Sequence, residues 1–205
     1  FINSGAEIIT TNSYAIVPSR IGMDKFLKHG QELVSKSVDV AYDAKVESGK
    51  GYVKIAASIP PIFASYRPDL FEKDEAIKLY PIIIDEFVKN SKVDILLAET
   101  IYSVEEADTI TSILTSKTKK PYWLSFTIDE KSGNLRSGEK IENIKSLIEK
   151  YDKLPQAILF NCSRPEIINQ AVRRLHKLDL GIRIGVYANL FVEKNDYTQS
   201  QKKIA

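Results

Sequence analysis

The hydrophobic positions along the chain fall into six short runs, separated by longer segments with helical spacing. The runs are rich in β-branched residues and cover 7–11, 52–58, 93–99, 122–127, 156–162 and 182–188. A short run that is apolar almost throughout is typical of a strand covered on both faces. The pattern therefore predicts six buried strands.

Between the runs, apolar residues recur every three or four positions, as on one face of a helix. The longest such segment extends from Lys25 to about Val46. Five stripes are predicted to face the core: Leu33, Val34, Val38, Ala41 and Ala44; Ile77, Tyr80, Ile84, Phe87 and Val88; Ala107, Ile110, Ile113 and Leu114; Ile141, Ile144, Leu147, Ile148 and Tyr151; Ile168, Ala171, Val172, Leu175 and Leu178. Regular alternation of strand and helix predicts an α/β fold with a parallel sheet.

Two architectures satisfy this alternation: an open doubly wound sheet and a (β/α)8 barrel. No glycine-rich phosphate loop follows any of the runs, which argues against a nucleotide-binding open sheet. Every run ends in polar residues: 11–13, Ser58, 99–100, Ser125 with Thr127, 161–162, and Tyr187 with Asn189. A barrel collects its site from the carboxyl ends of many strands, so this distribution favours the TIM-type barrel.

Six strands are fewer than the eight or so that a barrel needs. The chain also begins without Met, and Gly5 is placed where a left-handed residue would close a helix just before the first strand. We therefore expect residues 1–205 to be a single barrel domain that is incomplete at both ends, with the other strands before Phe1 and after Ala205.

Composition and charge exclude several classes of protein. Twenty-nine basic and 27 acidic residues give a formal net charge of +2, and the two signs are interleaved, so neither a nucleic-acid partner nor a membrane partner is indicated. No apolar run reaches the ~18 residues of a membrane span. A single cysteine rules out an internal disulfide and suggests a reducing compartment such as the cytoplasm. The oligomeric state is not indicated.

Three residues have both a structural and a functional interpretation. Cys162 is either a small buried hydrophobe or a ligand at a polar strand end. Glu99 follows an apolar run, so it forms an ion pair, lies at a solvated strand end, or is a buried anion that holds an ammonium group. Arg67 either pairs with Asp69 or recognises a carboxylate. His29 and His176 lie among charged neighbours in helical segments and are expected at the surface.

Six sequence blocks, in order, resemble the homocysteine S-methyltransferase family. They are "GAEIITTNSY", "ASIPPIFASYRPDLF", "DILLAETIYSVEEA", "YWLSFT", "LFNCSRPE" and "GVYAN", and together they extend from about Gly5 to Asn189. The resemblance implies a (β/α)8 barrel that binds Zn²⁺ through three cysteines. It also implies transfer of a methyl group from a cationic donor, of the S-methylmethionine or S-adenosylmethionine type, to the zinc-bound thiolate of homocysteine, which gives methionine.

The same resemblance suggests roles for individual residues. Cys162 would be the first metal ligand, and Glu99 would contact the amino group of the substrate. The cavity would be lined by Asn12, Tyr14, Ser125 and Asn189.

Two motifs of the family are missing from the chain. Neither the Asp-Gly pair of the first strand nor the Gly-Gly-Cys-Cys block near the end occurs, so one metal ligand of three is present. A zinc-bound thiolate is useful because a free thiol has a pKa of about 8.5, but a single cysteine cannot form a tetrahedral zinc site. Two functions therefore stay open: a methyltransferase whose activity in these 205 residues alone is doubtful, and a non-catalytic or truncated paralogue that keeps the fold without the metal.

Overall fold

The computed structural model describes residues 1–189, which form one sheet of six parallel strands with helices packed on it. Strands adjacent in the sequence are adjacent in the sheet, in the order β1 to β6. Their bounds are β1 Ile8–Thr10, β2 Lys54–Ile59, β3 Ile95–Ile101, β4 Tyr122–Phe126, β5 Ala157–Asn161 and β6 Arg183–Tyr187. All six predicted strands are therefore present, each within three residues of its predicted bounds.

The connections contain the helices that the apolar stripes predict. The α-helices are α1 Pro18–Ile21, α2 Met23–Glu47, α3 Lys73–Lys89, α4 Val104–Lys117, α5 Ile144–Glu149 and α6 Pro165–His176, and the 3₁₀ turns are η1 Ile2–Ser4, η2 Pro68–Leu70 and η3 Ile141–Asn143. Gly5 closes η1 with φ 98°, the left-handed conformation expected of it. None of the described helices is both long and apolar enough to cross a membrane.

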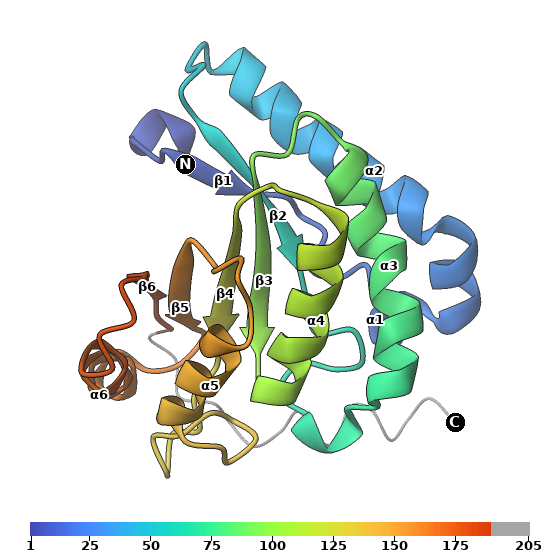
Figure 1. Cartoon of the computed structure of the whole chain (residues 1–205). Helices are drawn as coiled ribbons and strands as arrows, with labels where there is room; N and C mark the ends of the chain where they lie inside the picture. Colours follow the sequence, from blue (N-terminus) through green and yellow to red (C-terminus); the bar gives the residue numbers. More distant parts are fainter. Residues whose placement is uncertain (190–205) are drawn as a thin grey trace.

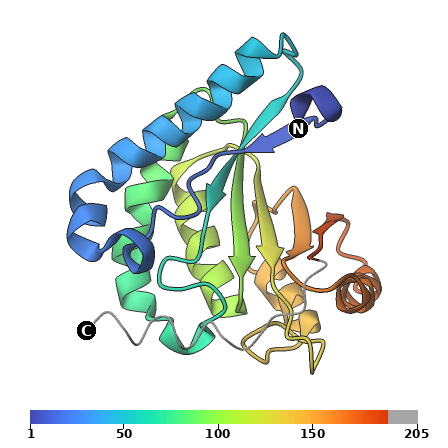
Figure 2. The same ribbon diagram turned by 180° about the vertical axis from the view of Figure 1, so that it is seen from behind.

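The sheet is curled like half of a barrel. Helices α2, α3 and α4 lie side by side on its outer face (Figure 1), and in the view from behind strands β3 and β4 lie in front of α4 (Figure 2). Sequential parallel order combined with helices on one face is the arrangement of a (β/α)8 barrel and differs from that of an open doubly wound sheet. The predicted fold class is confirmed.

Alternation along the strands separates two sets of apolar side chains. Leu96 and Ala98 of β3 belong to the main core between the sheet and the helices. Ile95 and Leu97 point to the opposite, inner face, where they pack with Ala56 and Trp123. Successive side chains of a strand point to opposite faces, so Glu99 belongs to the inner face as well.

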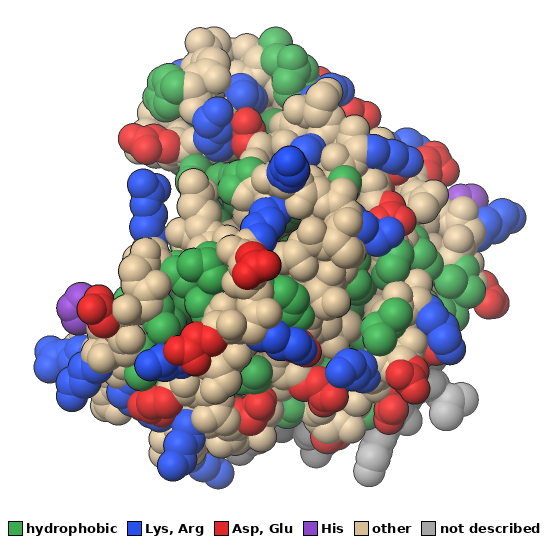
Figure 3. All heavy atoms as spheres, in the orientation of Figure 1, with side chains coloured by type: hydrophobic (Ala, Val, Ile, Leu, Met, Phe, Trp, Pro, Cys, Tyr) green, Lys and Arg blue, Asp and Glu red, His purple; other side chains and the backbone are tan. Residues whose placement is uncertain are grey.

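Two residues of the predicted stripes are exposed. Ile77 is 47% exposed although Tyr80 and Ile84 of the same stripe are buried, and Ala44 is exposed in the last turns of α2. A helical stripe is wider than the surface that the neighbouring elements cover, so its edge positions stay in contact with solvent. The surface charges are interleaved as expected, with lysines, arginines and acidic residues intermixed over the visible face (Figure 3).

Candidate functional site

The inner-face residues at the carboxyl ends of the strands are mainly polar. They are Ser58 of β2, Glu99 of β3, Ser125 of β4, Asn161 of β5 and Tyr187 of β6. Alternation places each of them on the same face as the inner apolar residues that precede it. The cluster therefore occupies the end of a parallel half-barrel at which barrel enzymes bind their substrates.

A β-bulge in β3 orients Glu99. Between Ala98 and Ile101, β3 advances three residues while β4 advances two, from Leu124 to Phe126, so β3 has one extra residue. Thr100 lies at this bulge, and its φ is 64°. A bulge of this kind bends the strand and changes the direction of a side chain, and here the affected side chain is the carboxylate of Glu99.

The Glu99 carboxylate is partly buried and accepts hydrogen bonds from two hydroxyl groups. The Ser58 Oγ donates to Oε1, and the Tyr187 hydroxyl donates to Oε2 at 3.1 Å. Tyr187 belongs to β6, three strands away from β3 in the sheet, so this bond spans the concave inner face. Burial raises the pKa of Glu99, and the hydrogen bonds from Ser58 and Tyr187 oppose the shift.

Asn161, at the end of β5, connects the strand of Cys162 with the strand of Glu99. Its Oδ1 accepts from the backbone N–H of Thr100 at 3.2 Å and from the Ser125 Oγ at 2.8 Å. Its Nδ2 donates to the Thr100 Oγ1 at 3.0 Å. The Asn161 side chain is fully buried, so these three bonds satisfy most of the hydrogen-bonding capacity of its amide.

Cys162 follows directly and is partly exposed, with φ 49°. Its backbone N–H donates to the Tyr187 carbonyl at 3.2 Å, which extends the pairing with β6 one residue past the end of β5. A left-handed conformation is uncommon for a residue other than glycine. The turn of the backbone at Cys162 ends the strand at the polar rim of the sheet.

Tyr14 lies close to both Glu99 and Cys162. Its hydroxyl shares a 2.7 Å hydrogen bond with the Ser65 Oγ in the loop after β2. Burial raises the pKa of Tyr14, and the nearby Cys162 and Glu99 raise it further. Burial, Glu99 and Cys162 raise the pKa of Tyr187 in the same way. The two tyrosines therefore lie near a thiol and a carboxylate on the inner face.

Asn12 is not part of this cluster. Thr11 and Ser13 point inward and are buried: the Thr11 hydroxyl accepts from the Ser58 N–H at 3.0 Å, and the Ser13 hydroxyl donates to the Ser58 carbonyl at 2.7 Å. Asn12, between them, points the other way and lines a groove of about 540 Å³ between β1 and α2. We predicted that Asn12 lines the same cavity as Glu99. The structure does not bring it there: Asn12 lies in a bend past the end of β1, and its side chain is exposed while those of Thr11 and Ser13 are buried against Ser58.

The remaining predicted residues are placed as follows. Ser125 is buried within the Asn161 network, whereas the side chain of Asn189 is exposed and only its backbone N–H, bonded to the Ser163 carbonyl at 3.0 Å, ties it to the site. Arg67 donates two hydrogen bonds to the Asp69 carboxylate, at 2.7 and 2.6 Å, which confirms the structural interpretation of that pair.

Four residues in and beside the cluster were not predicted as site residues: Ser58, Thr100, Asn161 and Tyr187. Asn161 and Tyr187 are polar residues at the ends of their apolar runs, which was a usable signal. The hydroxyl of Tyr187 reaches a residue 88 positions earlier, and nothing local in the sequence marks such a contact. The bulge at Thr100 has no signature either, because the residue that usually marks a left-handed bulge position is glycine.

The described residues do not by themselves fit a zinc ion. Cys162 is the single cysteine of the sequence, and within residues 1–189 no three histidine, cysteine or acidic side chains are grouped so that they could hold a metal. Tetrahedral zinc needs about three or four protein ligands, so Cys162 alone among residues 1–189 does not make such a site.

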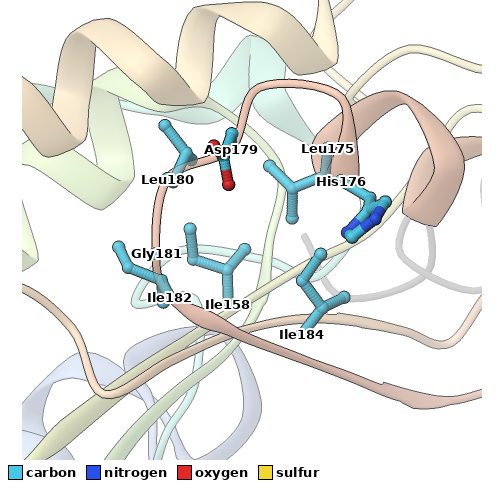
Figure 4. A pocket seen from close by; sticks show the side chains of 8 residues that line it. All are labelled: Ile158, Leu175, His176, Asp179, Leu180, Gly181, Ile182 and Ile184. Carbon is cyan, nitrogen blue, oxygen red and sulfur yellow. The ribbon is translucent and has the colours of Figure 1, made fainter.

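A second cavity lies at the opposite end of the strands. It has a volume of about 170 Å³ and is surrounded by apolar side chains of β5, α6 and β6, with His176 and Asp179 at its edge (Figure 4). None of the polar inner-face residues lines it. The cavity is therefore separate from the cluster around Glu99.

Comparison with known proteins identifies relatives with the same arrangement of elements. A family model described as homocysteine S-methyltransferase matches residues 1–205. The homocysteine S-methyltransferase of Escherichia coli (strain K12) is 26% identical over 203 residues, which cover 92% of this chain and 64% of that protein. The selenocysteine methyltransferase of Astragalus bisulcatus is also 26% identical, over 87% of this chain and 60% of that protein.

Among solved structures, the metallated form of the homocysteine methyltransferase MmuM from E. coli matches with a TM-score of 0.79 and 24% identity, covering 93% of this chain and 69% of that one. This likeness concerns the fold. The chain spans less than two thirds of the length of the two sequence relatives. Because the family model matches the whole of the sequence, the chain belongs to the homocysteine S-methyltransferase family.

Proposed function

We propose that the protein binds a thiol amino acid, homocysteine, on the inner face of the half-barrel and takes part in the methylation of its sulfur to give methionine. One observation carries the proposal: the partly buried Glu99 carboxylate accepts a hydrogen bond from the Tyr187 hydroxyl, and the Tyr187 carbonyl accepts one from the backbone N–H of Cys162, so an acid and a thiol residue share the carboxyl ends of the strands. The ammonium group of homocysteine would bind Glu99, and the sulfur of homocysteine would lie near Cys162.

Glu99 is suited to an ammonium group because hydroxyl groups are its hydrogen-bond donors among the described residues. Hydroxyl rotors can turn to other acceptors, so an arriving ammonium can take their place without leaving a polar group unpaired. The incoming positive charge would offset the cost of keeping the carboxylate ionised in a buried position.

The reaction we propose is a direct displacement at a methyl carbon. The homocysteine sulfur forms a bond to the methyl group as the bond from that methyl to a sulfonium sulfur breaks, a neutral thioether leaves, and the thiol proton is released. The donor would be a sulfonium of the S-methylmethionine or S-adenosylmethionine type. The faces of Tyr14 and Tyr187 provide electron-rich surfaces near which a cation is stabilised.

The names of the relatives do not determine how long the side chain of the substrate amino acid is. One is named for homocysteine and another for selenocysteine, whose side chain is one methylene shorter. We propose homocysteine for this chain. The cytoplasmic location suggested by the single cysteine remains a prediction.

The test is binding followed by turnover. Isothermal titration should show that homocysteine binds more tightly than homoserine, which has a hydroxyl in place of the thiol, and that Glu99→Gln weakens both. Methionine formation is then measured by mass spectrometry, with S-methylmethionine and S-adenosylmethionine supplied separately. Failure of the protein to bind homocysteine would contradict the proposal and favour a non-catalytic paralogue. Binding without methionine formation from either donor would contradict its catalytic half.

A further inference from the structure

We propose that Asn161 and Thr100 act together as positioning residues that fix the separation between the Glu99 carboxylate and Cys162, and thereby select the length of the thiol amino acid. The inference rests on the proposed function. The observations behind it are the backbone conformations on either side of the site and the hydrogen bonds between them.

Two residues of the site have left-handed backbones although neither is glycine. Thr100, next to Glu99, has φ 64°, and Cys162, next to Asn161, has φ 49°. For a β-branched residue such as threonine this conformation is a genuine outlier that carries an energetic cost. Glycine at position 100 would form the same bulge without that cost, so threonine must contribute something that glycine cannot.

The contribution is a second point of attachment. Asn161 accepts from the Thr100 backbone N–H at 3.2 Å and also donates to the Thr100 Oγ1 at 3.0 Å. Glycine would keep the first of these bonds and lose the second. The buried amide of Asn161 therefore holds both the backbone and the side chain of the residue that follows Glu99, and its own backbone continues directly into Cys162.

The network determines how far apart the two ends of a substrate can lie. Glu99 is on β3 and Cys162 follows β5, with β4 between them, and Ser125 of β4 donates to the same Asn161 oxygen at 2.8 Å. All three strands are therefore joined at one buried side chain. An amino acid held at its ammonium by Glu99 and at its sulfur near Cys162 must match this spacing, and one methylene is typically worth about 10- to 200-fold in discrimination.

A purely structural network would behave differently. If Asn161 only satisfied buried polar groups, its loss would lower stability and would weaken the binding of short and long thiols to the same extent. The informative measurement is therefore the ratio of the affinities for homocysteine and for cysteine, which a uniform loss of stability does not change.

The experiment compares the dissociation constants of homocysteine and cysteine by calorimetry in the wild type, Thr100→Gly, Thr100→Ser and Asn161→Ala. Thr100→Gly retains a backbone suited to the bulge, so it provides a folded variant even if Asn161→Ala does not fold. Asn169→Ala, on an exposed position of α6, is the matched asparagine control.

We expect the wild type and Asn169→Ala to prefer homocysteine by at least about 10-fold. Thr100→Gly should reduce this preference about five-fold or more, whereas Thr100→Ser, which keeps the hydroxyl, should retain it within about two-fold. Parallel weakening of both thiols in Thr100→Gly would overturn the inference and leave the proposed function intact. Absence of binding of either thiol to the wild type would overturn the proposed function, and the inference with it.

Discussion

Two carboxylates, one buried and one partly buried, lie seven positions apart in this chain and differ in what surrounds them. Glu106, in the first turn of α4, is fully buried and accepts from the Tyr80 hydroxyl at 2.8 Å and from the Tyr102 backbone N–H at 3.2 Å. Glu99, on the bulge of β3, is partly exposed and accepts from two hydroxyls. Burial raises the pKa of both residues.

The difference shows which buried acid is available to a ligand. One donor to Glu106 is a backbone N–H that cannot turn away, and the other, Tyr80, is itself held in place because its hydroxyl accepts from the Ile62 N–H at 3.3 Å. The Glu106 carboxylate is closed off from solvent and from ligands, so its hydrogen bonds stabilise the fold. The donors to Glu99 are hydroxyl groups that can rotate, and its carboxylate is partly exposed, so this carboxylate is available to bind a ligand.

The largest effect on stability should come from removing the buried carboxylate of Glu106. Glu106→Ala leaves the Tyr80 hydroxyl and the Tyr102 N–H buried without their acceptor, at roughly 1–3 kcal/mol each. We expect the free energy of unfolding to fall by about 3 kcal/mol at pH 5, measured by urea denaturation. Glu105→Ala, at the exposed neighbouring position, is the control. Equal losses in the two variants would contradict the distinction between buried and exposed positions.

The pH dependence of stability tests the same carboxyl group in another way. Burial raises the pKa of Glu106 to about 7 in the folded protein, so the folded state holds a proton there that the unfolded chain releases near pH 4.5. The stabilisation is present below pH 4.5 and is lost as the pH rises to about 7, by on the order of 3 kcal/mol. Glu106→Gln should flatten this decline in melting curves between pH 4.5 and 7.5, whereas Glu99→Gln should leave most of it. A decline of the same size in Glu106→Gln would show that another group titrates.

Removing the partly exposed carboxylate of Glu99 should weaken substrate binding and leave the fold intact. Glu99→Gln keeps the shape of the side chain but removes the charge that would hold the ammonium group. We expect about 100-fold weaker binding of homocysteine, equivalent to about 2.7 kcal/mol, with a change of less than about 1 kcal/mol in the free energy of unfolding. A large loss of stability together with unchanged affinity would reverse the roles assigned to Glu99 and Glu106.

A smaller effect is expected from the tyrosine that reaches Glu99 across the concave face. Tyr187→Phe removes one of the two hydroxyls that hold the Glu99 carboxylate in its orientation, while the Ser58 hydroxyl still donates to that carboxylate. We expect affinity for homocysteine to fall about five-fold, close to 1 kcal/mol, when measured by titration calorimetry. A loss as large as that in Glu99→Gln would mean that Tyr187 contacts the substrate itself.

The sequence predicted the fold more completely than the site. Strands such as β5 are apolar throughout because a helix covers one face and the barrel interior the other, so their composition alone identifies them. The position of the site followed from the polar residues at the ends of those strands. The pattern also included Ile77 in the core, because periodicity gives the direction of a side chain but not the extent of the elements that cover it.

The hydrophobic pattern of the sequence could not predict the geometry within the site, because that geometry depends on tertiary contacts. The left-handed backbone at Thr100 depends on hydrogen bonds from a residue 61 positions later. Glu106 lies four positions before Ile110, on the apolar face of α4, so periodicity gives its direction, but it does not reveal the hydrogen bonds from Tyr80 and Tyr102. Asn12 carried a plausible motif, yet its orientation follows from the pairing of Thr11 and Ser13 with Ser58, which is a tertiary contact.

The separation of Asn161 and Thr100 along the chain has a consequence for folding kinetics. Their hydrogen bonds close a loop of 61 residues, and they require β3, β4 and β5 to be in register beforehand. Contacts of this kind form late and are largely absent from the folding transition state. Loss of Asn161 should therefore accelerate unfolding and leave the folding rate nearly unchanged, so that the side chain that orients the site also prolongs the lifetime of the native state.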